Sequence, residues 1–278
     1  MQELGIEAAQ VIAWFPHEIE AHHVLVRVTP EHAGTWAAAL VHAVRRCYVS
    51  DEAVQLRAQQ LEAEIQGTVE FRQAQVVNSK LPDAGATMAG DFGEILIYFY
   101  QAARALPRTA FGPKRWRLKQ DRTKPAPCSD VVHFILPTWP APSDQDEILC
   151  AEVKMKSTDG GSSPIEDTIV DCAKDRTSRL SRTLQWLKER ALAEPLGVVQ
   201  LAHLNRFINT TDNPPATKRF RAVAVISSNL LDAELLKVPE QASPEYTLVV
   251  VAVPNLHAVY NAVYNAVKAE SLPPAPQQ

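Results

Sequence analysis

The segment 148–156, Ile-Leu-Cys-Ala-Glu-Val-Lys-Met-Lys, most constrains the fold, because it sets charged side chains inside a strand-length apolar run. Side chains alternate between the two faces of a strand, so Glu152 and Lys154 share one face while apolar residues occupy the other. Burying an acid and a lysine is costly unless both find partners. The pattern therefore predicts a central strand with a polar site on one face. The alternative is an exposed ion pair on an edge strand.

A second strand is predicted over 130–136, Asp-Val-Val-His-Phe-Ile-Leu. A hairpin-like return from this strand would bring Asp130 beside Glu152. Two neighbouring carboxylates repel each other, and Mg²⁺, which takes one or two carboxylates and keeps several waters, is a common remedy. A lysine such as Lys154 beside that ion would stabilise charge on a phosphate or orient an attacking water. The alternative is that Asp130 is only a turn residue before the strand.

Two helices flank these strands in the sequence. Gly90-Asp-Phe-Gly-Glu94 is expected to open the first, because apolar residues follow at helical spacing through Ala103. Glu94 would lie in its first turn, either as a site residue or as part of a capping box with Asp91. A long amphipathic helix is expected over 165–192, after a loop rich in glycine and serine.

The rest of the chain predicts a smaller α/β unit before this region and more of the same sheet after it. A break in the pattern at 78–90, with one proline and two glycines beyond Asn78, is the expected boundary. His133 is expected to be a core histidine and Cys150 a packing residue. Further strands are expected at 23–28, 222–226 and 246–253. Helices are expected to begin at Pro30 and at Leu256, and another is expected over 51–66 with Ser50 or Asp51 as its cap.

Charge is unevenly distributed along the chain. The formal net charge is −4, but residues 1–75 carry ten acids and five bases, whereas residues 108–124 carry seven bases and one acid. The basic segment contains Trp116 and is expected to be irregular and exposed, so it would contact a nucleic-acid backbone and stack on a base. The alternative is a solvated loop that faces a partner. The predicted nucleic-acid-binding residues are Lys114, Arg115, Arg117, Lys119, Arg122, Lys124 and Arg179 of the long helix.

Several function classes are excluded by composition. No run reaches the roughly 18 apolar residues of a membrane helix, so no membrane partner is expected. The first residues, Met-Gln-Glu-Leu-Gly, do not look like a secretion signal. The 4 cysteines are widely spaced, which argues against a zinc cluster or a disulfide framework. We therefore expect a cytoplasmic protein.

The order of these elements resembles the PD-(D/E)xK nuclease superfamily. In that superfamily a helix with a glutamate, a strand with an aspartate, a strand with Glu-x-Lys and a long helix follow one another, and Ser129 stands where a proline is often found. The resemblance implies an α/β fold with a restriction-endonuclease-like mixed sheet flanked by helices, over 81–272. A smaller N-terminal α/β domain over 1–80 would precede it and a disordered tail over 273–278 would follow.

The same resemblance implies roles for the site residues. Asp130 and Glu152 would ligate Mg²⁺, with Mn²⁺ as a substitute. Glu94 would ligate a second ion or a metal-bound water. Lys154 would polarise the water or the scissile phosphate.

A narrower resemblance is to the HamA family, the nuclease-type subunits of Hachiman anti-phage systems. It rests on Gly90-Asp-Phe-Gly-Glu94, Ser129-Asp-Val-Val-His-Phe134 and Glu152-Val-Lys-Met-Lys-Ser157, and it covers roughly residues 88–195. It implies a metal-dependent deoxyribonuclease that acts as the effector of a defence complex. A superfamily 2 helicase, HamB-like, would control it, and the acidic N-terminal domain would hold that partner. The alternatives are a non-catalytic interaction subunit with a nuclease-like fold and a stand-alone restriction or repair endonuclease.

Overall fold

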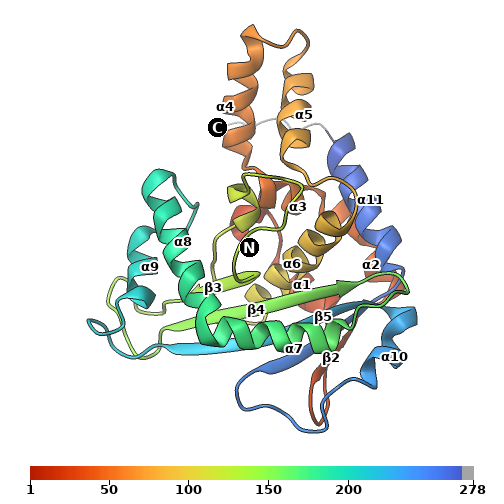
Figure 1. Ribbon diagram of the computed structural model, residues 1–278. Coiled ribbons are helices and arrows are strands. Elements are labelled where there is room, and N and C mark those ends of the chain that lie inside the picture. Colours follow the sequence, from red (N-terminus) through yellow and green to blue (C-terminus); the bar gives the residue numbers. More distant parts are fainter. Residues whose placement is uncertain (271–278) are drawn as a thin grey trace.

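A computed structural model describes residues 1–270 and contains one six-stranded sheet (Figure 1). The inner four strands are parallel neighbours, and an antiparallel strand closes each edge. This confirms the predicted α/β class with a mixed sheet and flanking helices. Across the sheet the strands are β1 (His17–Ile19), β2 (Val24–Arg27), β6 (Thr247–Val253), β5 (Thr217–Ser227), β4 (Glu147–Lys156) and β3 (Val131–Ile135).

Strand β4 lies inside the sheet, between β3 and β5. Its pairing is antiparallel with β3 and parallel with β5. Glu152 is only 1% exposed, so the prediction of a central strand is confirmed and the edge-strand alternative is wrong.

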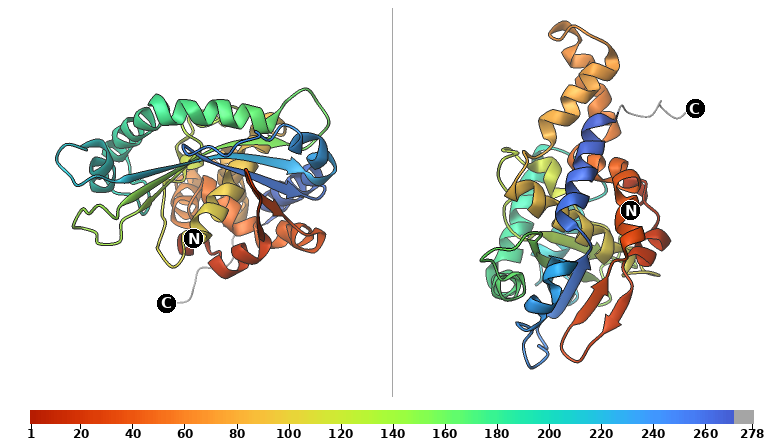
Figure 2. Two further views of the ribbon diagram at one scale, coloured as in Figure 1. Left: turned by 90° about the horizontal axis from the view of Figure 1, so that it is seen from below. Right: turned by 90° about the vertical axis from the view of Figure 1, so that its right-hand side faces the viewer.

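Helices cover both faces of the sheet, as Figure 2 shows edge-on. One face carries α6 (Ala86–Ala103), whose predicted apolar positions are all buried and pack with Ala151 and Val153 of β4. The opposite face carries α7 (Pro164–Lys174) and α8 (Leu180–Ala193). Also in the α6 layer are α1 (Ala8–Trp14), α2 (Pro30–Ala39), α3 (Val41–Tyr48) and α11 (Leu256–Ala269), while α9 (Leu201–Ile208) and α10 (Leu231–Leu235) lie with α7 and α8.

Helix α6 begins at Ala86, four residues before the predicted start. Its N-cap is Gly85, which places Asp91 and Glu94 inside the helix. Asp91 is buried there and accepts hydrogen bonds from Lys119 and Tyr48. The interpretation of Asp91 and Glu94 as a capping box is therefore wrong.

The long helix predicted over 165–192 is present as α7 and α8, which are continuous through a π-helical turn at Asp175–Arg179. A π turn adds a residue to the helical repeat, and such turns are frequent at functional sites. This one shifts the side chains of Asp175 and Arg179 relative to the α-helical turns on either side.

The first 80 residues contribute to the same sheet and core as the rest of the chain. Strand β2 pairs with β6, and side chains from 4 to 267 form one apolar cluster. The predicted boundary near residue 80 falls between α5 (Val69–Lys80) and α6, and strands from both sides of it are hydrogen-bonded in one sheet.

Helix α5 and the preceding α4 (Asp51–Gln60) form a hairpin that stands away from the sheet (Figures 1 and 2). Ser50 caps α4 as predicted, its Oγ accepting from the Ala53 N–H at 3.2 Å. The helix ends at Gln60 and a 3₁₀ turn follows over Leu61–Ala63. The predicted tail, 273–278, lies outside the described residues. Within residues 1–270, no helix has the length and apolar character needed to cross a membrane.

Candidate active site

Asp130 immediately precedes β3, and the antiparallel register with β4 brings it to Glu152. Val131 pairs with Ala151, so one further step along the hairpin sets Asp130 opposite Glu152. The Asp130 carboxylate accepts a hydrogen bond from the Val153 N–H at 2.9 Å. The predicted hairpin-like return is confirmed, and the carboxylate bonds to the neighbouring strand rather than to a local turn.

Glu152 lies on the face of β4 that looks toward α7 and α8. One carboxylate oxygen accepts from Lys154 Nζ at 2.8 Å and the other from Arg179 Nη1 at 2.6 Å. Its main-chain oxygen accepts from Thr168 Oγ1 on α7. Burial, and then the nearby charge of Asp130, raise the pKa of Glu152 to about 8, against the opposing effect of Lys154.

Glu94 approaches from α6 and is also buried. Its Oε2 accepts from the indole Nε1 of Trp116 at 3.0 Å. Burial, and then the charge of Asp130, raise the pKa of Glu94 well above its ordinary value. Asp130 thus acts electrostatically on both glutamates.

Lys154 bridges two carboxylates. Its Nζ is 2.8 Å from Glu152 and 2.7 Å from Asp171 of α7, while a third of the side chain remains exposed. These contacts overcome the cost of burial and raise the lysine pKa, so the ammonium is charged at neutral pH. A fixed, partly exposed cation beside acids is suited to bind a phosphate oxygen.

Three residues of the long helix that were not predicted as site residues lie near this centre, namely Asp171, Asp175 and Thr183. Asp171 orients Lys154, and Asp175 is fully buried in the π turn, where its Oδ1 accepts from Ser129 Oγ at 2.8 Å. The Ser129 N–H in turn donates to Thr183 Oγ1 at 3.0 Å. The residue just before Asp130 is therefore held by two side chains of the long helix.

Arg179 was predicted to contact nucleic acid, but in the structure it binds Glu152 and lies within 3.7 Å of Asp171 and 3.6 Å of Asp175. A signal for this cluster was present in the sequence, since Asp171, Asp175 and Arg179 recur at four-residue spacing. That spacing places polar side chains on one side of a helix.

The basic segment differs from its prediction. Lys114 and Arg117 both bind Glu3, at 2.6 and 3.0 Å, and Lys119 binds Asp91. Arg115 is buried as well and donates to the Ala126 carbonyl. The expectation that these four residues are exposed is wrong, because acids distant in sequence neutralise Lys114, Arg117 and Lys119 inside the fold and a main-chain carbonyl accepts from Arg115.

Trp116 is 3% exposed, so the expectation that it is available for stacking is wrong too. Arg122 and Lys124 do reach solvent, although they pair with Asp83 and Asp121. Their contact with nucleic acid stays a prediction. Lys156, at the end of β4, is buried against Glu234 at 2.9 Å.

Two expectations about buried residues are confirmed. His133 is fully buried, its Nδ1 is 3.1 Å from the Gln101 amide nitrogen, and burial lowers its pKa well below the usual value. Cys150 packs in the core, and burial raises the pKa of its thiol.

Carboxylate oxygens are the ligands that Mg²⁺ prefers, and Glu94, Asp130 and Glu152 supply them. These donors fit a divalent cation in chemistry. As the side chains stand, no three His, Cys, Asp or Glu residues among residues 1–270 are arranged to hold a metal between them. Glu152 would have to exchange Arg179 for the ion.

Comparison with known proteins gives one result at the level of the family. A family model described as HamA matches residues 10–267. No curated protein matches the chain.

Proposed function

The chain belongs to the HamA family, whose model spans most of its length, and from that membership in Hachiman defence we propose that it is a Mg²⁺-dependent deoxyribonuclease of the PD-(D/E)xK type. One observation carries the catalytic part of this proposal. Three carboxyl groups gather beside the partly exposed ammonium of Lys154: burial, and then the charge of Asp130 just before β3, raise the pKa of both Glu94 and Glu152. Perturbed acids of this kind concentrate at functional sites.

The three carboxylates have different roles in this proposal. Asp130 and Glu152 would hold Mg²⁺, or Mn²⁺ in its place, and Glu94 would hold a second ion or an ion-bound water. The metal, when bound, supplies Lewis-acid stabilisation of the phosphate and lowers the pKa of water. Trp116 keeps Glu94 oriented through the 3.0 Å indole hydrogen bond.

The cations act on the substrate. Asp171 also binds Lys154, at 2.7 Å, so the ammonium would stay in place if Glu152 turned to hold an ion. Its partly exposed Nζ then donates to a non-bridging phosphate oxygen or to the attacking water. If Arg179 were released from Glu152, it would remain within reach of Asp171 and Asp175. Its guanidinium could then stabilise the negative charge that develops on the phosphate.

On the basis of the family assignment, the proposal includes control by a helicase partner. The acidic N-terminal region supports a role in holding such a partner, because an acidic surface repels DNA. Within this region the α4–α5 hairpin stands away from the sheet, and we assign the partner contact to it.

Cleavage assays test the proposal. The chain, produced with and without its neighbouring helicase subunit, is incubated with plasmid DNA and Mg²⁺. Glu152→Ala and Lys154→Ala are each expected to lower cleavage by at least about 100-fold. Lys188→Ala, on α8 away from the carboxylates, is the matched control and should leave cleavage unchanged.

A specific observation favours a second candidate, a non-catalytic subunit. Both oxygens of Glu152 are already bound by cations, as in a structural ion-pair cluster. If neither the chain alone nor the chain released from its partner cleaves DNA, the nuclease proposal fails and the interaction subunit is retained.

A further inference from the structure

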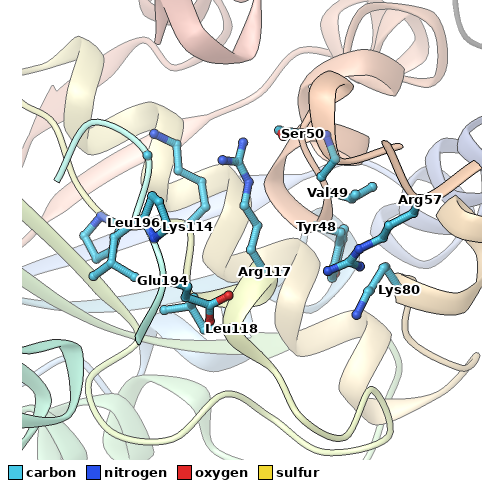
Figure 3. Close-up of a pocket in the computed structure, with 14 residues that line it drawn as sticks. Tyr48, Val49, Ser50, Arg57, Lys80, Lys114, Arg117, Leu118, Glu194 and Leu196 are labelled. Atoms are coloured by element: carbon cyan, nitrogen blue, oxygen red, sulfur yellow. Dashed lines mark hydrogen bonds between the residues drawn. The ribbon is translucent and has the colours of Figure 1, made fainter. Parts of the chain in front are cut away.

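A small hollow lies between the α4–α5 hairpin, the segment 113–118 and the loop 194–197 (Figure 3). Its volume is about 160 Å³. Four cationic side chains and one carboxylate line it: Arg57, Lys80, Lys114, Arg117 and Glu194.

The four cations differ in their partners. Lys114 and Arg117 are neutralised by Glu3. Arg57 and Lys80 make no ion pair with any acid in residues 1–270, whereas every other base of α3, α4 and α5 has one. Those pairs are Arg45 and Arg46 with Asp51 and Arg72 with Glu62.

Arg57 and Lys80 converge from two consecutive helices. Figure 3 shows both side chains directed into the hollow, with Glu194 across from them. Burial, and then the charge of Arg57, lower the pKa of Lys80, while Glu194 opposes that shift. The fold therefore holds two like charges together at this hollow, Arg57 exposed and Lys80 half-buried, where Glu194 offsets them only in part. Such an arrangement costs free energy that a bound anion would recover.

We propose that this hollow binds a phosphoryl group. A guanidinium fork and an ammonium side by side match the oxygens of a phosphate, which Arg engages in pairs and Lys as a point charge. The volume admits a phosphate or a pyrophosphate rather than a whole nucleotide. The carrier of the group has room outside, since a second hollow of about 380 Å³ shares Ser50, Arg117, Pro195 and Gly197 with the first.

The proposed site is separate from the carboxylate site, but one 3₁₀ turn contributes residues to both. Arg117 and Leu118 line the hollow, and Trp116 of the same 3₁₀ turn (Arg115–Leu118) donates to Glu94. Phosphate binding does not depend on any nuclease activity, so a binding measurement tests the site whatever the outcome of the cleavage assays.

Calorimetric titration of the full chain with inorganic phosphate is the test. Arg57→Gln and Lys80→Gln are each expected to weaken phosphate binding about tenfold or more, as loss of one charge-assisted hydrogen bond does. Glu194→Gln removes the opposing charge and is expected to tighten binding several-fold. Lys188→Gln, an unpaired lysine of α8 outside the hollow, is the control and should bind like the parent.

Competition distinguishes the source of the group. If a 5′-phosphorylated dinucleotide displaces phosphate and its 5′-hydroxyl counterpart does not, the site takes a nucleic-acid end. If only phosphate and pyrophosphate compete, it takes the free anion.

Two results would overturn the proposal. One is that phosphate does not bind at millimolar concentration. The other is that it binds equally to the parent, Arg57→Gln and Lys80→Gln. Misfolding does not confuse the test, because removing either unpaired charge relieves repulsion and should leave the unfolding midpoint unchanged or higher.

Discussion

The ion pair between Lys119 and Asp91 gives the sharpest test of how this fold uses its basic segment. Lys119 Nζ lies 2.6 and 2.7 Å from the two carboxylate oxygens, and the side chains are only 4% and 1% exposed. Tyr48 donates a further hydrogen bond to Asp91 at 2.8 Å. Lys119→Met keeps the length of the aliphatic chain and removes the charge, so Asp91 would be left buried without its cation.

We expect this substitution to lower the free energy of unfolding by about 3–5 kcal/mol at pH 8, the usual cost of breaking a buried pair from one side. Burial already raises the pKa of Asp91 above 3.8, and loss of Lys119 raises it further. The folded variant then binds a proton that the unfolded chain has released, so the cost grows as the pH rises from about 4. The destabilisation should be smaller at pH 5 than at pH 8.

Urea denaturation followed by circular dichroism measures this cost. Lys124→Met, at a side chain that is 76% exposed, is the matched control and should change stability by no more than about 0.5 kcal/mol. The double variant Asp91→Asn/Lys119→Met should recover much of the loss, because it removes the buried charge. The reasoning is refuted if Lys119→Met costs no more than Lys124→Met.

Further predictions concern stability and thiol reactivity. Burial lowers the pKa of His17 to about 4. As the pH falls, the unfolded chain therefore takes up a proton near pH 6.5, whereas the folded chain takes it up only near pH 4, so stability should fall over that range. His17→Gln should make the fall in urea midpoints smaller. Arg206→Met breaks a buried pair with Asp146 and should lower the free energy of unfolding by about 3–5 kcal/mol in the same assay. Cys47 is buried with a pKa raised to about 12, so a thiol reagent should modify the partly exposed Cys128 rapidly in the native protein and Cys47 only on unfolding.

The parts of the site that lie in one hairpin could be predicted from the sequence. Alternation along 148–156 separated the polar from the apolar face, and a short antiparallel return was enough to bring Asp130 to Glu152. Helical spacing likewise located the buried side of α6, although not its start, because Gly85 rather than Asp91 is the N-cap. Each of these features depends on residues that are close together in the sequence, which is why the sequence predicts them.

Interactions between distant segments were not predictable. Charge counting along the chain indicated an exposed basic segment, but Glu3, 111 residues before Lys114, neutralises it inside the fold. The contacts of Asp175 with Ser129 cross 46 residues and depend on a π turn. A count of charges gives their number, whereas only the folded chain gives their partners.

The central claim is that Glu94, Asp130 and Glu152 together form a site for a divalent cation. Calorimetric titration of the chain with Mg²⁺, repeated with Mn²⁺, tests it most directly and needs no substrate or partner. We expect a cation to bind, and Asp130→Asn and Glu152→Gln each to weaken it at least about tenfold. Asp159→Asn, at an exposed loop carboxylate, should have no effect. Absence of cation binding, or equal binding by all four proteins, would contradict the claim.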